Sequence, residues 1–215
     1  MTLNLSKGVL NKRVFKQHIL DIHLKDFMLG QTTPYLNKFK NTIDVGAATG
    51  MYASHFAEHS KNVICFEAVP PVYEQLEKIK QKHNNIITHN VAVSNFEGVS
   101  GFYVDDKRLS NSGFQNLVDG PLINVDTVTI DSMKLNDVGF MKIDVEKHEV
   151  KLIQGAKETI KRCNPIIFIE DHNYFYKKGA TGIDWLMMMG YEILDYVGSY
   201  NYILKQSGMF KNRQA

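Results

Sequence analysis

The chain has few cysteines and no long apolar stretch. Only 2 of its 215 residues are cysteines. Cys65 and Cys163 lie in or beside apolar segments, where we expect small buried side chains rather than a disulfide or a metal pair. No apolar run approaches the length that spans a bilayer, and residues 1–5 lack the arrangement of a signal peptide. These features predict a cytoplasmic protein without a membrane span.

A strong charge of one sign is also missing. Lysine and arginine number 25 against 23 acidic residues, which gives a formal net charge of +2. The basic residues are scattered along the chain rather than gathered in one block. Because nucleic-acid binders usually carry a basic stripe, we expect no nucleic-acid partner.

The order of segments predicts an α/β fold. Residues 9–29 place apolar side chains among lysines and histidines, which predicts one or two amphipathic helices that end at Gly30. We therefore divide the chain into an N-terminal helical segment, 1–40, that packs on a single domain, 41–215. Within that domain strands alternate with helices, as is typical of a parallel sheet with helices on both faces. The strands are expected at 41–45, 62–67, 86–93, 139–144 and 165–170, and the helices at 50–59, 70–82, 147–161 and 182–189.

The last two strands are expected at 191–197 and 200–204. Only Gly198-Ser199 joins them, and a two-residue link is typical of a hairpin. The two strands must therefore be antiparallel. A parallel sheet that ends in one antiparallel hairpin is unlike the sheet of the nucleotide-binding dehydrogenases.

A turn of small residues follows the first strand. Asp44-Val45 leads into Gly46-Ala47-Ala48-Thr49-Gly50 before an expected helix. Small residues at such a turn let a ligand lie against the backbone, and the helix start offers unpaired N–H groups. The next strand ends in Glu67, about 20 residues later, where a carboxylate can accept hydrogen bonds from both hydroxyls of a ribose. Together these features predict a cofactor that contains adenosine.

The spacing within the turn distinguishes between cofactors. Dinucleotide enzymes usually show G-x-G-x-x-G, whereas here no glycine lies between Gly46 and Gly50, and Asp44 precedes both. An acidic residue at the strand end would repel a pyrophosphate but suits a ligand with an ammonium group, such as S-adenosylmethionine. We therefore favour S-adenosylmethionine over NAD. In the alternative interpretation the two glycines serve only helix packing.

Acidic residues follow the later strands as well. Asp144, Glu146 and His148 come after the strand at 139–144, and Glu170-Asp171 ends the next one. Ligands of open parallel sheets bind beyond the carboxyl ends of the strands. We therefore expect these side chains to project toward the same crevice as Gly46.

Four stretches of the chain together carry a resemblance to a known family. They are Asp44-Val45-Gly46-Ala47-Ala48-Thr49-Gly50, Phe66-Glu67-Ala68, Asn90-Val91-Ala92-Val93-Ser94 and, most specifically, Lys142-Ile143-Asp144-Val145-Glu146-Lys147-His148-Glu149. With them the chain resembles the FkbM-type S-adenosylmethionine-dependent methyltransferases over roughly residues 40–170. The resemblance implies a Rossmann-like class I methyltransferase fold, with a seven-stranded, mostly parallel sheet, a C-terminal antiparallel hairpin and helices on both faces.

The resemblance also implies an activity and a set of cofactor residues. Members are mostly O-methyltransferases, so the expected reaction moves a methyl group to a hydroxyl of a sugar, glycan or related small molecule. Members usually carry glycine where this chain has Lys147. The residues implied to contact the cofactor are Asp44, Gly46, Ala47, Gly50 and Asp144, with Glu67 at the ribose, Ala68 beside ribose and adenine, and Asn90, Val91 and Ala92 at the adenine. Asn90 has the alternative of only stabilising a turn.

An alcohol acceptor must lose its proton as it attacks, which needs a positioned base or a metal. Asp144, Glu146 and His148 compete for the role of base, and His148 titrates nearest neutral pH. A lone histidine at a helix start is more often a surface residue. Alternatively, Asp144, Glu170 and Asp171 hold Mg²⁺ through hard oxygen ligands, or they are ordinary strand-end carboxylates paired with lysines.

Two other classes of function stay open at this stage. A nucleic-acid methyltransferase that acts on base amino groups usually carries an Asn/Asp-Pro-Pro-aromatic motif after the fourth strand. This chain has Asp144-Val145-Glu146-Lys147 there, so that motif is missing. A non-catalytic module that binds S-adenosylmethionine would keep Gly46, Gly50 and Glu67 without turnover.

Overall fold

The computed structural model describes residues 28–105, 112–115, 120–176, 179–198 and 200–208. The prediction for the N-terminal segment, 1–40, lies mostly outside these residues. In its described part, residues 28–32 are helical and a short 3-10 helix, η1 (Thr33–Tyr35), follows. The helix was predicted to end at Gly30, but in the structure it continues through Gly30 to residue 32. Met28 is buried against the core of the domain.

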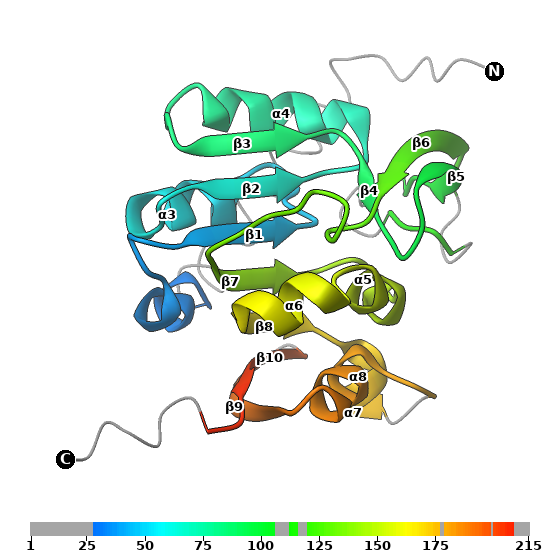
Figure 1. The fold of residues 1–215 in the computed structure, drawn as a ribbon. Coiled ribbons are helices and arrows are strands. Elements are labelled where there is room, and N and C mark those ends of the chain that lie inside the picture. Colours follow the sequence, from blue (N-terminus) through cyan, green and yellow to red (C-terminus); the bar gives the residue numbers. More distant parts are fainter. Residues whose placement is uncertain (1–27, 106–111, 116–119, 177–178, 199, 209–215) are drawn as a thin grey trace.

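A seven-stranded sheet forms the centre of the fold (Figure 1). Its strands are β1 (Asn41–Val45), β2 (Val63–Phe66), β3 (Ile86–His89), β7 (Val138–Ile143), β8 (Ile166–Glu170), β9 (Tyr191–Gly198) and β10 (Asn201–Gln206). They lie in the order β3-β2-β1-β7-β8-β10-β9. The pairs from β3 to β8 are parallel, whereas β10 is antiparallel to both β8 and β9. The predicted mostly parallel sheet with a C-terminal antiparallel hairpin is confirmed.

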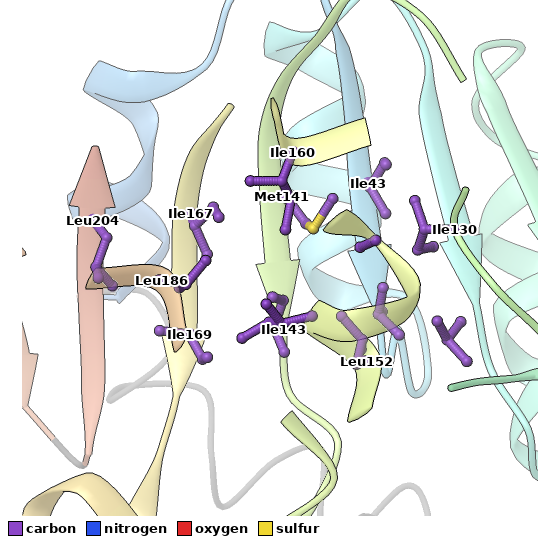
Figure 2. Close-up of a cluster of buried hydrophobic side chains, with 14 of the residues drawn as sticks. Ile43, Ile130, Met141, Ile143, Leu152, Ile160, Ile167, Ile169, Leu186 and Leu204 are labelled. Atoms are coloured by element: carbon purple, nitrogen blue, oxygen red, sulfur yellow. The ribbon is translucent and has the colours of Figure 1, made fainter. Parts of the chain in front are cut away.

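Helices cover both faces of this sheet. On one face, α5 (Glu149–Gly155), α6 (Lys157–Cys163) and α8 (Gly182–Met188) bury apolar side chains against the strands. Figure 2 shows this layer, where Ile43, Met141 and Ile143 of the sheet meet Leu152 and Ile160 of the helices. On the other face, α3 (Met51–His59) packs on the sheet and α4 (Pro70–Lys80) packs on α3 and β3. Burial of these two apolar layers is the main source of stability.

The helix predicted at 147–161 is two helices, α5 and α6, which meet at Ala156. The break has a long-range cause, because the carboxylate of Asp131 accepts hydrogen bonds from the backbone N–H groups of Glu158 and Thr159 at 3.0 and 2.7 Å. A carboxylate in this position satisfies N–H groups at the start of a helix. Cap residues that come from a distant turn leave no local signal in the sequence.

A smaller sheet lies beyond the end of the main one (Figure 1). It contains β4 (Ala92–Val93), β6 (Leu122–Val128) and β5 (Gly98–Tyr103), in the order β4-β6-β5. The strand predicted at 86–93 is thus divided between the two sheets. None of the described helices, including the short α7 (His172–Tyr176), is long and apolar enough to cross a membrane.

Candidate active site

The turn after β1 is tied to both neighbouring strands. The backbone N–H groups of Gly46 and Ala47 both donate to the carbonyl of Phe66 at 3.0 Å, and the N–H of Asp144 donates to Val45 at 3.2 Å. Gly46 has a φ of +73°, and a Cβ there would lie 1.9 Å from the carbonyl oxygen of Asp144. Only glycine allows this approach. The turn and the end of β7 are therefore in direct backbone contact.

Gly50 serves helix packing. Its φ is +86°, and a Cβ there would lie 2.7 Å from the side chain of Leu76 and 3.1 Å from that of Ile79, both on α4. The alternative interpretation of the glycines, close packing, is thus visible at Gly50, where α3 begins against α4. A role in packing does not exclude a second role in binding, so Gly50 stays a cofactor candidate.

Glu67 connects the same turn to the end of β2. Its side chain is buried, and its two carboxylate oxygens accept hydrogen bonds from the N–H groups of Ala48 at 3.0 Å and Val69 at 2.8 Å. Burial raises the pKa of Glu67 to about 7, although the two backbone hydrogen bonds oppose the shift. The side-chain amide of Asn90 donates to the carbonyls of Glu67 and Ala68 at 2.8 and 3.2 Å.

The predicted cofactor residues therefore gather at one edge of the sheet. Asp44 and the glycine turn follow β1, Glu67 and Ala68 follow β2, and Asn90 and Val91 connect β3 to Ala92 at the start of β4. Asn90 fixes the turn after β2, which was one of the two roles predicted for it. Whether these side chains contact a cofactor stays a prediction.

Lys142 forms a buried ion pair that the sequence analysis missed. Its Nζ lies 3.2 Å from Oδ1 of Asp44 and 3.4 Å from Oδ2 of Asp144, and it donates to the carbonyl oxygen of Gly46 at 3.0 Å. Asp44 is fully buried, and its Oδ2 has no hydrogen-bond partner among the described residues. Burial by itself lowers the pKa of Lys142, but the two aspartates outweigh burial and raise it, so the lysine stays charged.

The Lys142 ammonium also lies over an aromatic ring. Its Nζ is 5.2 Å from the ring centroid of Tyr52, which packs between Phe56 of α3 and Phe168 of β8. A signal for this arrangement exists in the sequence, because a lysine inside the apolar strand Phe140-Met141-Lys142-Ile143 is buried only when it is paired.

Two further carboxylates, Glu170 and Glu146, lie near Asp144 on the exposed side of its ion pair with Lys142. The side chains of Asp144 and Glu170 are hydrogen-bonded to each other, and burial followed by the charge of Asp144 raises the pKa of Glu170 well above its usual range. Glu146 is half-buried, and burial followed by the charge of Asp144 raises its pKa to about 7. The raised pKa values of Glu170 and Glu146 therefore favour bound protons on these two side chains near neutral pH. The three carboxylates come from the ends of two adjacent strands, as predicted.

His148 is placed differently from the prediction, which put it at the mouth of the site. It is only 4% exposed, its Nε2 lies 2.9 Å from the hydroxyl of Ser94, and its ring stacks on Phe114 with centroids 4.0 Å apart. Burial lowers the pKa of His148 to about 4, so the ring is neutral at pH 7. His148 joins the start of α5 to the end of β4.

The predicted Mg²⁺ site is not formed. Asp171 is fully buried, and its two carboxylate oxygens accept the backbone N–H groups of Tyr174 at 2.9 Å and Ile183 at 3.2 Å. It therefore secures the starts of α7 and α8 instead of joining Asp144 and Glu170. Across the described ranges, no group of three histidine, cysteine or acidic side chains is arranged to hold a metal ion.

A cavity of about 460 Å³ lies beside the site. It is an open cavity bordered by the start of α5, the loop before α8 and the edge of the smaller sheet. Phe96, Phe114, Lys147, His148, Lys151 and Thr181 are among the residues that line it.

Comparison with known families matches this arrangement. The model of the FkbM methyltransferase domain matches residues 44–204 of the chain. The chain belongs to the FkbM methyltransferase family. The family expected from the sequence is confirmed. The match spans every strand end described above, from Asp44 to the β9–β10 hairpin.

Solved structures agree with the FkbM fold. The methyltransferase FkbM from Methylobacillus flagellatus KT has a TM-score of 0.56 and 14% sequence identity, over 79% of this chain and 44% of that one. A Streptococcus mutans protein proposed to be a methyltransferase, solved in complex with SAH, has a TM-score of 0.50 and 9% identity, over 83% of this chain and 94% of that one. This chain thus spans less than half of the Methylobacillus protein. At these identities the likeness shows the fold alone. No curated protein matches the sequence as a relative.

Proposed function

We propose that this FkbM family member transfers a methyl group from S-adenosylmethionine to a hydroxyl of a sugar, glycan or related small molecule. The observation that carries the proposal is the carboxylate cluster of Asp144, Glu146 and Glu170, which adjoins the glycine turn. Asp144 lies in backbone contact with Gly46, so a methyl donor held by the turn and an acceptor held by the carboxylates would be neighbours. Alignment of two reactants in such a site can contribute about 7–11 kcal/mol to catalysis.

The residues at this edge fit S-adenosylmethionine chemically. When bound, this cofactor supplies an electrophilic methyl group on a positively charged sulfur. Glu67 is fixed by two backbone hydrogen bonds, and each of its oxygens keeps a lone pair that can accept a ribose hydroxyl. The side chain of Asp144 is 36% exposed, so it would hold the ammonium group.

Buried Asp44 is proposed to act on the cofactor through Lys142. Its carboxylate does not reach the surface, and Lys142 links it to the carbonyl of Gly46 and to Asp144. The backbones of Gly46, Ala47 and Gly50 would border the methionine part. Ala68, Asn90, Val91 and Ala92 would border the adenine.

Glu146 is the best candidate for the base. A base works best when its pKa lies near the pH of the reaction, and the pKa of Glu146 is about 7. Asp144 and Glu170 share a hydrogen bond beside it and would orient the acceptor hydroxyl. The Nε2 of His148 is engaged with Ser94, so we assign His148 the role of holding the chain at 146–149 in place.

Two measurements test the proposal. Calorimetry should show binding of S-adenosylmethionine and S-adenosylhomocysteine but not of NAD. Replacement of Glu67 by alanine should weaken binding by about 1–3 kcal/mol, because charge-assisted hydrogen bonds are lost. The control is Glu97→Ala, which removes an exposed carboxylate before β5 and should leave the affinity unchanged.

Incubation with radiolabelled S-adenosylmethionine and a panel of neutral and acidic glycosides should then transfer label to a sugar oxygen. Label that appears in RNA or DNA instead, and never in a glycoside, would refute the sugar acceptor. An affinity for the cofactor that is unchanged in Glu67→Ala would place the ribose elsewhere.

A further inference from the structure

Aromatic rings gather at the end of β8 and the start of β10. We call His172, Phe175, Tyr176 and Tyr200 the aromatic platform. Tyr200 is its centre, with ring centroids 4.2 Å from His172, 5.1 Å from Phe175 and 5.6 Å from Tyr176. The hydroxyls of Tyr176 and Tyr200 are 2.8 Å apart.

Two rings of the platform, those of Phe175 and Tyr176, are largely exposed. Phe175 and Tyr176 are 49% and 53% exposed, and neither belongs to a buried core cluster. Large rings that stay in water beside one another often mark a surface that binds something. Tyr200 also has a φ of +66°, an unfavourable conformation for a bulky residue, and such residues cluster at functional sites.

The platform borders the carboxylate cluster of the candidate active site. Nε2 of His172 lies 3.2 Å from Oε1 of Glu170, whose side chain is hydrogen-bonded to Asp144. The carbonyl of Tyr200 accepts the N–H of Asp171 at 2.9 Å, and Asn201 lies opposite Glu170 in the sheet. A molecule that rests on the rings would therefore reach the carboxylates with its edge.

The two neighbouring surfaces describe the chemistry of the ligand. The rings suit a flat apolar face, and the tyrosine hydroxyls and carboxylates suit an edge rich in hydroxyls. The carboxyl groups of Asp144, Glu146 and Glu170 offer hydrogen-bond donors and acceptors to hydroxyls, but no cation that would compensate the charge of an anionic ligand at that edge. A pyranose or furanose without phosphate or carboxylate combines an apolar C–H face with a hydroxyl edge.

We infer that the aromatic platform seats the C–H face of a neutral sugar ring and directs one of its hydroxyls toward Asp144 and Glu170. This inference rests on the proposed function, since it locates the acceptor of that reaction. It also separates the acceptor from the cavity beside His148, whose lining carries two lysines, Lys147 and Lys151, against one carboxylate, Glu149, and would favour an anion instead.

The test is saturation-transfer difference NMR on the full chain loaded with S-adenosylhomocysteine. The probes are methyl glycosides of glucose, galactose, mannose and rhamnose, with methyl glucuronoside as the anionic comparison and a short single-stranded RNA as the nucleic-acid comparison. We expect the ring C–H protons of at least one neutral glycoside to receive saturation. Phe175→Ala and Tyr176→Ala should each weaken its binding, measured by titration, by roughly five- to tenfold.

Three control variants make the result specific. Tyr176→Phe keeps the ring and removes only the hydroxyl, so it should lose less affinity for the glycoside than Tyr176→Ala does. Phe96→Ala removes an aromatic ring from the cavity beside His148, and Phe39→Ala removes an exposed ring that precedes β1. Neither should change glycoside binding. The affinity for S-adenosylhomocysteine should be the same in every variant, which shows that each one folds.

Different outcomes overturn different claims. Glycoside binding that survives Phe175→Ala and Tyr176→Ala but falls in Phe96→Ala would move the acceptor to the cavity and refute the platform, while methyl transfer to the sugar would leave the proposed function intact. Stronger binding of the glucuronoside or the RNA than of every neutral glycoside would refute the neutral sugar. A loaded protein that neither binds nor methylates any glycoside would refute both claims.

Discussion

Replacement of Lys147 by glycine tests whether the backbone beside Asp144 is strained. Lys147 has a φ of +68°, the left-handed region that favours glycine, and Glu146 before it also has a positive φ of +48°. The conformation is held from both sides, because the N–H of Lys147 donates to the Glu149 carboxylate at 2.9 Å and its carbonyl accepts from Gln115 at 3.0 Å. Both hydrogen bonds involve the backbone of Lys147 and persist in a glycine variant.

The magnitude follows from two opposing effects. A residue other than glycine in the left-handed region costs about 1–2 kcal/mol. Replacement by glycine removes this cost, but glycine loses more conformational freedom on folding, which offsets about 0.5–1 kcal/mol of the stabilisation. The lysine side chain is exposed, so its removal changes little. We therefore expect Lys147→Gly to raise the free energy of unfolding by about 0.5–1 kcal/mol.

The assay is urea unfolding, with Lys147→Ala as the matched control. Alanine removes the same side chain but keeps the strained backbone, so its free energy of unfolding should stay within about 0.5 kcal/mol of the unaltered chain. If glycine is no more stable than alanine, the turn is not strained and the reasoning fails. Because the FkbM-type methyltransferases usually carry glycine here, the same comparison shows what the lysine costs this chain.

Three further predictions concern buried charges. Lys142→Met should destabilise the fold by about 3–5 kcal/mol, because it leaves Asp44 buried without its partner, and Asp44→Asn in the same chain should recover part of this loss in urea unfolding. Glu146→Gln should lower kcat by about 10²–10⁴-fold without changing the affinity for S-adenosylmethionine. With Glu146 as the base, activity should rise as the pH passes through about 7, and the variant should lose this rise. A variant whose activity still rises with pH in this range excludes Glu146 as the base. Burial raises the folded pKa of Glu149 to about 7 from an ordinary 4.5, so the folded state binds its proton more tightly and stability falls as pH rises from 4.5 to 7. Glu149→Gln should therefore become more stable than the unaltered chain as the pH rises from 4.5 to 7, by at most about 3 kcal/mol at 1.36 kcal/mol per pKa unit. His148 has the opposite effect, because its lowered pKa destabilises the fold as the pH falls below 6.5. Both chains contain His148, so its effect cancels in the comparison.

The parallel strands of the main sheet were predicted well, because most of them are short apolar runs bounded by polar residues or glycine. The hairpin was predictable from the two residues between its strands. The break between α5 and α6 was not, since it depends on Asp131, which is distant in the sequence and supplies the cap. The division of 86–93 between two sheets likewise depends on Asn90, whose amide bonds to carbonyls at the end of β2. Contacts of this kind exist only after the chain has folded.

The acidic residues of the site show the same limit more sharply. The sequence placed Asp44 at the end of β1 and predicted that its charge would meet a cationic ligand. In the structure the Asp44 carboxylate is buried and forms an ion pair with Lys142 on the neighbouring strand, so its charge is compensated within the protein. Opposite charges that cancel inside the sheet leave Asp144, on the exposed side of the same lysine, as the carboxylate that a ligand can reach. We therefore propose that Asp144, at the end of β7, rather than Asp44 of β1, is the carboxylate that acts on the ligand. Asp144→Asn should weaken binding of S-adenosylmethionine, measured by calorimetry, and leave the free energy of unfolding in urea nearly unchanged. Asp44→Asn should mainly change the free energy of unfolding. The reverse pattern in these two variants would return the role of ligand-binding carboxylate to Asp44.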